Sequence, residues 1–159
     1  MAVSKKVVSY LKKNKVTYKT LKHEVAYTAQ EIAAAQHVSG KVVAKSVLIK
    51  TDKKDKNFIL AVLPATHLID FNKLKKLAKV KKLTLAKEED MSKLFPDVEA
   101  GAMAPLGPLY NIPIYIDKTL GLGQDIIFNA GTHTDMIKIR YRDFDKLNKP
   151  TTGIFGKLS

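Results

Sequence analysis

The sequence has no cysteine, and this absence excludes several kinds of protein at once. The chain can contain no disulfide bond, no thiolate nucleophile and no cysteine-based zinc site. Its stability must therefore come from a packed core, which 159 residues with 45% hydrophobic content are sufficient to form. A fold without crosslinks suits the reducing cytoplasm, where we expect this protein to act.

Long hydrophobic segments are absent as well. The first fifteen residues, MAVSKKVVSYLKKNK, have lysines on both sides of a short apolar patch and lack the features of a signal peptide. The apolar run at 42–49 is far shorter than the roughly 20 residues that a membrane-spanning helix needs. The sequence therefore predicts no membrane span.

Acidic residues are scarce: the chain has 15 of them against 28 Lys and Arg, which gives a formal net charge of +13. An excess of this size favours a polyanionic partner, with nucleic acid as the first candidate and an anionic membrane surface as the second. The alternative is that the lysines only keep the protein soluble, and charge alone does not distinguish these possibilities.

The common catalytic and cofactor motifs are missing too. The sequence contains no GxSxG, HExxH, Walker or GxGxxG motif. Carboxylates are rare in the apolar segments, which argues against a mechanism with paired acids. No two of the four histidines have the spacing of metal ligands, so we expect neither a metal nor a cofactor; they are His23, His37, His67 and His133.

Helical and strand-like patterns alternate irregularly, which predicts one mixed α+β domain over residues 1–159 with its core at about 16–147. Start and stop signals predict helices at 4–14, at 28–40, after Asp70, at 87–95 and at 141–147. Strands are expected at 16–21, 41–50, 57–63, 82–85, 114–117, 126–129 and 136–140. Segment 101–113, with three prolines, is expected to be mostly loop, and residues 150–159 a loosely held tail.

Lys45 is the most informative residue, because it interrupts the otherwise apolar segment 42–49. Both faces of this segment are nearly all apolar, as in a central strand that is covered on both sides. A buried ammonium group needs an anion, a set of carbonyl groups or a cavity. We therefore interpret Lys45 as a functional residue; the alternative is a lysine whose flexible chain reaches solvent at the edge of the sheet.

A second candidate is the segment GAMAPLG at 101–107. Glycines at its two ends permit close approaches of the backbone, and Pro105 restricts the conformation between them. Such a loop can direct backbone N–H groups into a pocket, where they would stabilise a developing oxyanion. An ordinary structural turn would show a similar pattern.

A third candidate is the segment NAGTHTD at 129–135, between two predicted strands. Gly131 indicates a turn, and His133 could act as an acid, a base or a hydrogen-bond donor. A histidine in a loop is often simply solvated, and Asp135 could equally well anchor the loop.

These segments, in this order, resemble the YbaK/prolyl-tRNA-synthetase-associated domain family of aminoacyl-tRNA editing domains. The resemblance covers about residues 22–147 and includes HEVAYTAQEIAAA, VVAKSVLIK, FILAVLPATHLIDFNKL, GAMAPLG, IPIYID and FNAGTHTDMIKI. It implies a curved, mixed, barrel-like sheet surrounded by helices, with a pocket between the strand of Lys45 and the 101–107 loop. It also implies hydrolysis of the ester that joins a mischarged amino acid to tRNA, of the tRNA-Pro type or a related one.

The resemblance makes Lys45 the essential lysine of the family and places Gly101, Pro105, Gly107 and Gly131 at its loop and turn positions. The other roles below are hypotheses from the residues themselves. The catalytic residues would be Lys45, Gly101 and His133. The residues expected to bind the substrate are Ala102, Met103, Ala104, Pro105, Gly107, Gly131 and Thr132. The lysines expected to hold the tRNA backbone, in the 51–57 loop and in the helix after Asp70, are Lys53, Lys54, Lys73 and Lys76.

Three other functions are compatible with the same residues. A protein with this fold could bind tRNA as an adaptor without catalysis, or hydrolyse small esters or amides while its positive charge is incidental. It could also be a basic module that binds anionic membranes through helix 4–14. For the editing function we expect a monomer with no membrane partner, which binds mischarged aminoacyl-tRNA and, as a further candidate, an aminoacyl-tRNA synthetase.

Overall fold

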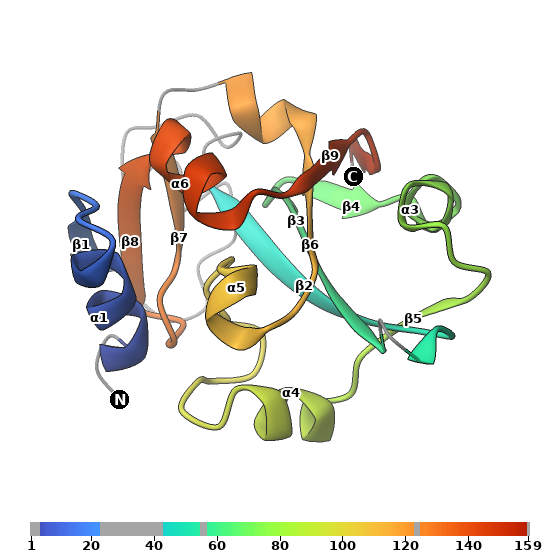
Figure 1. The fold of residues 1–159 in the computed structure, drawn as a ribbon, viewed down its shortest axis with the longest axis horizontal. Coiled ribbons are helices and arrows are strands. Elements are labelled where there is room, and N and C mark those ends of the chain that lie inside the picture. The colour runs from blue at the N-terminus through green and yellow to red at the C-terminus, as the bar shows by residue number, and fades with distance from the viewer. Residues whose placement is uncertain (1–3, 23–42, 55–56, 123–124, 159) are drawn as a thin grey trace.

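The computed structural model describes residues 4–22, 43–54, 57–122 and 125–158 (Figure 1). The described helices and strands of the first half of the chain are, in order, α1 (Lys5–Lys13), β1 (Lys19–Lys22), β2 (Ala44–Thr51), β3 (Phe58–Pro64), β4 (His67–Ile69), α3 (Phe71–Ala78), β5 (Leu83–Leu85) and α4 (Glu88–Leu94). The second half contains α5 (Gly107–Tyr110), β6 (Ile114–Asp117), the 3-10 helix η3 (Lys118–Leu122), β7 (Asp125–Asn129), β8 (Asp135–Arg140), α6 (Tyr141–Asn148), β9 (Thr151–Gly153) and β10 (Gly156–Leu158).

Two sheets form the centre of the fold. The larger has the order β5-β2-β3-β6-β9 and is mixed, because β2 is antiparallel to β3 and β5 whereas β6 is parallel to β3 and β9. The smaller, β1-β8-β7, is antiparallel, and β4 and β10 form a separate pair. A bridge between Val43 and Ile127 joins the start of β2 to β7, so the two sheets meet there. The predicted mixed α+β fold is confirmed.

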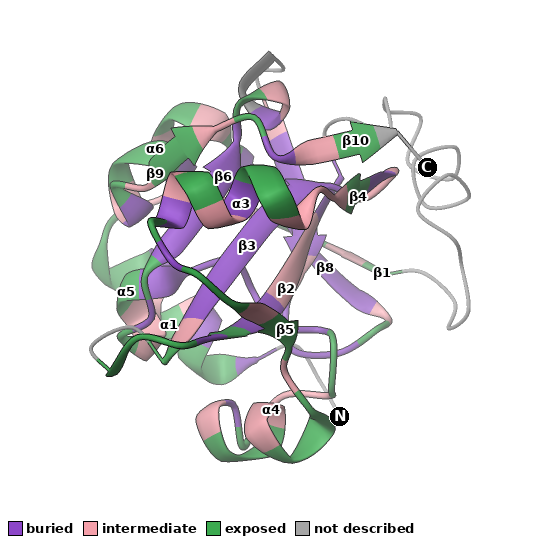
Figure 2. Cartoon of the chain, turned by 90° about the vertical axis from the view of Figure 1, so that its right-hand side faces the viewer, coloured by how far each residue is buried: buried purple, intermediate pink, exposed green. Residues whose placement is uncertain are grey.

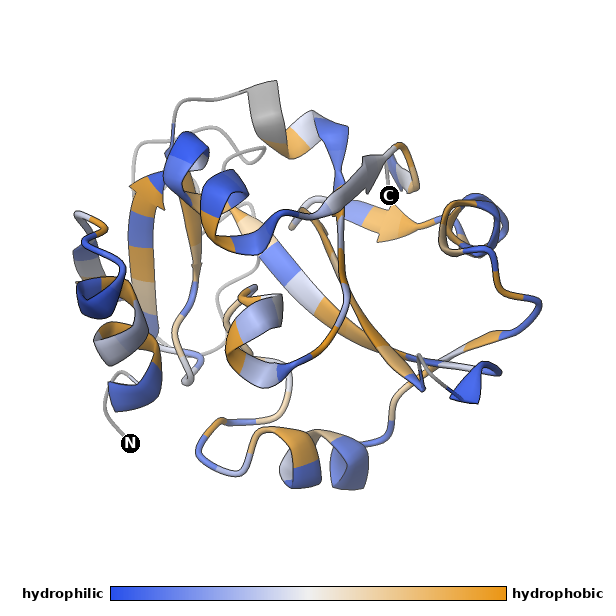
Figure 3. Cartoon of the chain, viewed as in Figure 1, coloured by the Kyte–Doolittle hydropathy of each residue, from blue (hydrophilic) through white to orange (hydrophobic). Residues whose placement is uncertain are grey.

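The larger hydrophobic core, called the main core here, contains residues of both sheets and of helices α1 and α6. Val7 and Leu11 of α1 and Phe144 of α6 are fully buried in it, together with Phe128 of β7 and Leu60 of β3. Central strands such as β3 and β6 are buried in Figure 2, and hydrophobic residues concentrate on the same strands in Figure 3, whereas much of the surface of α1 and α6 is hydrophilic. The amphipathic pattern that predicted these helices therefore matches their packing.

A second core lies on the other face of the larger sheet. Leu74 and Ala78 of α3 pack there against Ile49 and Ile59 of the β2–β3 hairpin and against Phe155. Alternation along β2 and β3 divides their side chains between the two cores, as expected of strands that are covered on both faces.

Local capping explains where two helices begin. The Ser4 side chain accepts a hydrogen bond from the Val7 N–H at 3.4 Å, and the Asp70 side chain accepts one from the Lys73 N–H at 3.2 Å. Each bond satisfies a helical N–H group that has no partner within its helix. The predicted helices at 4–14 and after Asp70 are confirmed within about one residue.

The prediction of a loosely held tail is wrong. Strand β9 pairs in parallel with β6 at the edge of the larger sheet, and β10 pairs with β4. Between them Phe155 is fully buried, and its N–H and that of Gly156 donate to the Asp117 carboxylate at 3.0 and 2.6 Å. The segment looks loop-like because it is short, polar and contains two glycines, while its partners lie more than thirty residues earlier.

Two further predictions have a mixed outcome. Segment 101–113, predicted to be mostly loop, contains the four-residue helix α5. Strand β1 begins three residues later than the predicted strand at 16–21. The helix predicted at 28–40 lies outside the described residues. Among the residues that are described, none of the helices is long and apolar enough to cross a membrane.

Replacing Phe155 by alanine is expected to lower the free energy of unfolding by about 3–5 kcal/mol, because it leaves a cavity in the second core. Urea denaturation measures the change. The matched control is Ile154→Ala, one residue earlier, whose side chain is 59% exposed and whose loss should cost less than about 0.5 kcal/mol. Equal, small effects of both substitutions would show that the segment is loosely held after all.

The Asp117 carboxylate should make stability depend on pH. Burial raises its pKa, but hydrogen bonds from Thr119, Phe155 and Gly156 lower it, and the net result is a lowered pKa. A lowered pKa in the folded state stabilises the fold above the unfolded-state value of about 4, and this contribution is lost as the pH falls through the folded value. Asp117→Asn should be less stable at pH 7 and show a weaker acid dependence in denaturant titrations from pH 7 to 3. An unchanged acid dependence would contradict this assignment.

Candidate functional site

Lys45 lies in β2 with its side chain half-buried. Burial lowers the pKa of its ammonium group, because the charged form loses part of its hydration. Among the described residues, Lys45 forms no hydrogen bond or ion pair. The ion pair in the described part of the chain joins two other residues, Lys138 and Asp125, at 3.8 Å. The side chain therefore has a partly desolvated charge without a protein partner in the described part of the chain.

The alternation of β2 determines which neighbours Lys45 has. Lys45 shares a strand face with Val47 and Ile49, which pack in or against the second core. The next residue, Ser46, points to the opposite face, that of the main core, and its Oγ is buried without a hydrogen bond in the described part of the chain. Alternation therefore places Lys45 on the strand face opposite to the main core, in which Met103 and Ala104 of the 101–107 loop pack.

The 101–107 loop is mostly inside the protein. Ala102, Met103 and Ala104 are at most 2% exposed, and the last two pack in the main core with Leu106. Pro105 and Gly107 are buried as well. The side chains predicted to bind substrate therefore form part of the core, whereas Gly101 is exposed.

The backbone N–H groups of this loop are only partly engaged. The N–H of Ala102 donates to the Glu99 carbonyl at 2.9 Å, that of Leu106 to the Ala104 carbonyl at 2.8 Å, and that of Gly107 to Asn148 Oδ1 at 3.1 Å. No hydrogen bond in the described part of the chain uses the N–H groups of Gly101, Met103 or Ala104. Because Gly101 alone among these three is exposed, its N–H is the one that a substrate can reach most directly.

Asn148, at the end of α6, is a residue that the sequence did not single out. Its side chain is 4% exposed; Nδ2 donates to the Pro105 carbonyl at 3.0 Å while Oδ1 accepts from Gly107. A buried amide with both ends hydrogen-bonded fixes the second half of the loop. The two partners are more than forty positions apart, so no local pattern indicates this role.

The predicted turn at 129–135 is confirmed. Gly131 has φ +99°, a conformation that residues with a Cβ rarely adopt. Thr132 Oγ1 donates to Asp135 Oδ2 at 2.6 Å and accepts from the Asp135 N–H at 2.9 Å. Asp135 is 5% exposed, so it anchors the turn, which was one of the two roles considered for it.

His133, at the exposed tip of this turn, is held in one orientation. Its Nε2 lies 2.7 Å from the Ala100 carbonyl oxygen, and its backbone N–H donates to Glu99 Oε1 at 2.7 Å. A carbonyl oxygen only accepts, so Nε2 carries a proton and, in a neutral ring, Nδ1 is the unprotonated nitrogen. Glu99 had not been recognised as part of the site, because a single Glu in a loop has no distinctive pattern.

Backbone hydrogen bonds join the two loops. The Gly131 N–H donates to the Ala102 carbonyl at 3.0 Å, and the Glu99 N–H donates to the Gly131 carbonyl at 2.9 Å. A Cβ at Gly101 would lie 3.5 Å from His133 Cε1. The structure thus brings Gly101, Ala102, Gly131 and His133 together, as one surface that we call the loop junction (residues 99–102 and 130–133).

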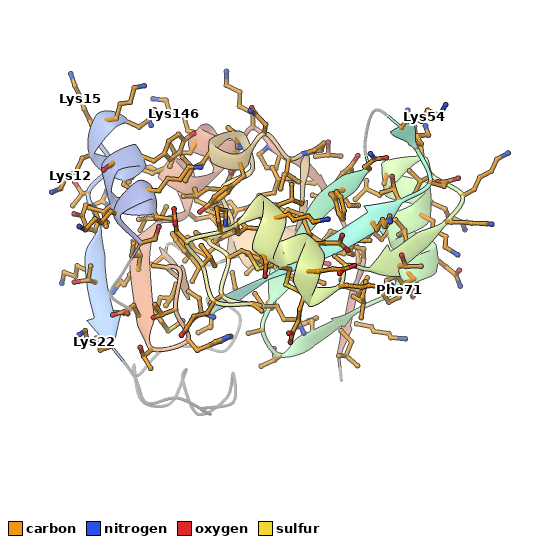
Figure 4. The ribbon with its side chains drawn as sticks, turned by 90° about the horizontal axis from the view of Figure 1, so that it is seen from below. Lys12, Lys15, Lys22, Lys54, Phe71 and Lys146 are labelled. Atoms are coloured by element: carbon orange, nitrogen blue, oxygen red, sulfur yellow. The ribbon has the colours of Figure 1, made fainter. Side chains whose placement is uncertain are left out.

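The four lysines predicted to hold tRNA are exposed. Lys53 and Lys54 lie in the β2–β3 connection, and Lys73 and Lys76 lie on α3. The seven residues from Lys45 to Thr51 extend about 20 Å along β2, so the connection is remote from Lys45. Figure 4 shows Lys54 at the end of the molecule opposite to Lys12, Lys15 and Lys22.

Two cavities in the described part of the chain, of about 430 and 260 Å³, are both lined by residues 111–113, and neither is lined by Lys45, Gly101 or His133. Among the described residues, no three His, Asp or Glu side chains are grouped so that they could hold a metal ion.

Comparison with known families identifies the class of protein. A family model for the aminoacyl-tRNA editing domain matches residues 23–147, which is most of the chain. The chain therefore belongs to the aminoacyl-tRNA editing domain family, and the resemblance seen in its sequence is confirmed.

Individual relatives agree with this family. The chain is 22% identical over 159 residues to the prolyl-tRNA editing protein ProX of Acetoanaerobium sticklandii, covering 98% of this chain and 96% of that protein. Its fold is similar to a crystal structure described as a candidate trans-editing enzyme for prolyl-tRNA synthetase, with a TM-score of 0.82, 18% identity and coverage of 98% and 99%. The structure of the hypothetical protein APE2540 is also similar, with a TM-score of 0.82, 20% identity and coverage of 96% and 100%. These structural similarities establish the fold.

Glu99→Gln is expected to loosen the loop junction, because it weakens the charge-assisted hydrogen bond to the His133 N–H. We expect a loss of about 1 kcal/mol in the free energy of unfolding and a changed NMR signal of the His133 ring. Glu89→Gln on α4 is the control, since its exposed carboxylate has no hydrogen bond in the described part of the chain. An unaltered His133 signal in Glu99→Gln would mean that Glu99 does not position the histidine.

Proposed function

We propose that the protein is a trans-editing aminoacyl-tRNA deacylase, which hydrolyses the ester between a wrongly attached amino acid and tRNA. The observation that carries this proposal is the half-buried ammonium group of Lys45, which has no partner in the described part of an editing-domain chain. A partly desolvated cation without a protein anion is suited to an anionic ligand or to a developing negative charge. Perturbed groups of this kind occur more often at functional sites than elsewhere.

The chemistry requires only a water molecule and charge stabilisation, because an aminoacyl ester is already reactive. Water attacks the carbonyl carbon, and the tetrahedral oxyanion then expels the ribose oxygen of the terminal adenosine. The products are the free amino acid and a tRNA whose ribose hydroxyl has received the proton. Lys45 would neutralise the oxyanion or the terminal phosphate, so no nucleophile from the protein is needed.

The loop junction would contribute two further groups. The N–H of the exposed Gly101 forms no hydrogen bond in the described part of the chain, and it could donate one to the oxyanion. His133 Nδ1 is available to accept a hydrogen bond from the attacking water, because Nε2 is occupied by the Ala100 carbonyl. Ala102, Met103, Ala104, Pro105 and Gly107 would act through the shape of the backbone rather than through exposed side chains.

The preferred substrate is a mischarged tRNA of the tRNA-Pro type. Support comes from the relative ProX, whose name describes a prolyl-tRNA editing protein. We propose that the protein works as a monomer in the cytoplasm, on tRNA released by a synthetase.

A tRNA-binding adaptor without catalysis is the second candidate. It is favoured by the burial of Met103 and Ala104 in the main core. An adaptor would protect the ester bond, whereas a deacylase would release the amino acid.

The test is a deacylation screen over several mischarged tRNAs, including mischarged tRNA-Pro, with wild type, Lys45→Ala and Lys50→Ala. Removing Lys45 should reduce kcat/KM by roughly 10²–10³ while the binding of uncharged tRNA stays near normal. Lys50 is the matched control, because it lies on the same strand, carries the same charge and is exposed.

Full turnover by Lys45→Ala would refute the role of this residue. Protection of every substrate by the wild type would support the adaptor. Turnover of a small aminoacyl ester that uncharged tRNA does not inhibit would instead support a small-molecule hydrolase.

A further inference from the structure

Helix α1 and the residues after it form a strongly basic surface. Residues 4–22 contain seven lysines and no acidic residue. All seven are exposed, and none forms an ion pair within the described part of the chain. We define the α1 lysine face as the five of these on or next to the helix, which are Lys5, Lys6, Lys12, Lys13 and Lys15.

The apolar side of α1 is fully used inside the protein. Val7 and Leu11 are 0% exposed in the main core, and the partly buried Val8 and Tyr10 pack against the same core. A helix that inserts into a membrane surface needs a free apolar face in addition to its cations. The α1 lysine face offers charge alone, which fits the phosphate backbone of a nucleic acid better than a lipid surface.

The beginning of α1 is attached to the loop junction. The Ser4 N–H donates to the Ala130 carbonyl at 2.8 Å, and a Cβ at Gly131 would lie 2.9 Å from Ser4 Cβ. Gly131 in turn is hydrogen-bonded to Ala102, so the helix begins directly beside the candidate site. Its nine residues then extend about 13 Å from that point, with lysines near both ends.

We propose that the α1 lysine face binds the phosphate backbone of the tRNA next to its aminoacylated end. This inference rests on the proposed function, and it adds a binding surface to the four lysines identified from the sequence. An acylated end placed at the loop junction leaves the adjoining RNA beside α1, whereas Lys53 and Lys54 lie beyond the far end of β2. Lysine contacts of this kind position the RNA without reading its sequence.

The choice of residues for a test follows from their contacts. The Nζ of Lys6 lies 4.8 Å from the centre of the Tyr110 ring, so replacing Lys6 could disturb the packing of α1 on α5. Lys12 and Lys13 are exposed in the last turn and form no hydrogen bond through their side chains in the described part of the chain. The matched control is the pair Lys87 and Lys93, exposed residues at the two ends of the acidic helix α4.

The experiment measures the binding of uncharged tRNA across a salt titration for wild type, K12Q/K13Q and K87Q/K93Q. Removing two phosphate contacts should weaken binding roughly tenfold and reduce the slope of log K against log salt by about 2. The control pair should bind like the wild type. Melting temperatures and hydrolysis of a small aminoacyl ester should be the same for all three proteins, because neither the fold nor the catalytic groups are changed.

If K12Q/K13Q bound tRNA like the wild type, these lysines would not contact the RNA and the proposal would be overturned. Equal losses of affinity in both double variants would overturn it as well, because they would show only an effect of net charge. Tighter binding to vesicles that contain anionic lipid than to tRNA would also overturn it. If the wild type releases no amino acid from any mischarged tRNA but K12Q/K13Q still loses tRNA affinity, the RNA surface stands and the proposed deacylase function fails.

Discussion

The candidate site depends on a small set of backbone hydrogen bonds between segments that lie some thirty positions apart in the sequence. The Gly131 N–H donates to the Ala102 carbonyl, and the Glu99 N–H donates to the Gly131 carbonyl. In the same turn, the Ala130 carbonyl accepts a hydrogen bond from Ser4, the N-cap residue of α1. Together with the hydrogen bonds of His133 to Glu99 and Ala100, these bonds fix Gly101 and His133 relative to each other. Catalysis by charge stabilisation needs groups that are already oriented, and this junction orients them.

Lys45 is fixed by a different part of the fold, the interior of the larger sheet. Strand β2 pairs with β3 around Lys45 and with β5 only at Ile49–Thr51. Alternation places Ser46, rather than Lys45, towards the core that contains Met103 and Ala104. Side chains that the family resemblance assigns to a pocket are thus packed inside. Specificity would then depend on the exposed backbone and on the exact shape of the loop, rather than on the identity of those side chains.

The correct predictions rest on interactions between residues that are close in the sequence. The features that were missed rest on interactions between residues that are far apart in the sequence. The helices that start at Ser4 and Asp70 were predictable, because a cap and an apolar stripe lie within a few residues of each other. Lys45 was found because a lysine in an apolar strand violates a local rule. Asn148 and Glu99 were missed, since their partners lie 41 and 34 positions away in the chain. The loose tail was wrongly predicted for the same reason.

The position of β9 has a consequence for the order in which the protein can form. Thr151 pairs with Tyr115, so the outer edge of the larger sheet is completed by residues that a ribosome adds thirty-six positions after the strand they join. Until then β6 has one unpaired edge, and the second core lacks Phe155. Parallel pairing over such a distance is slow compared with local contacts. During synthesis the nascent chain therefore exposes a hydrophobic strand edge, which is a natural binding site for chaperones or a starting point for aggregation.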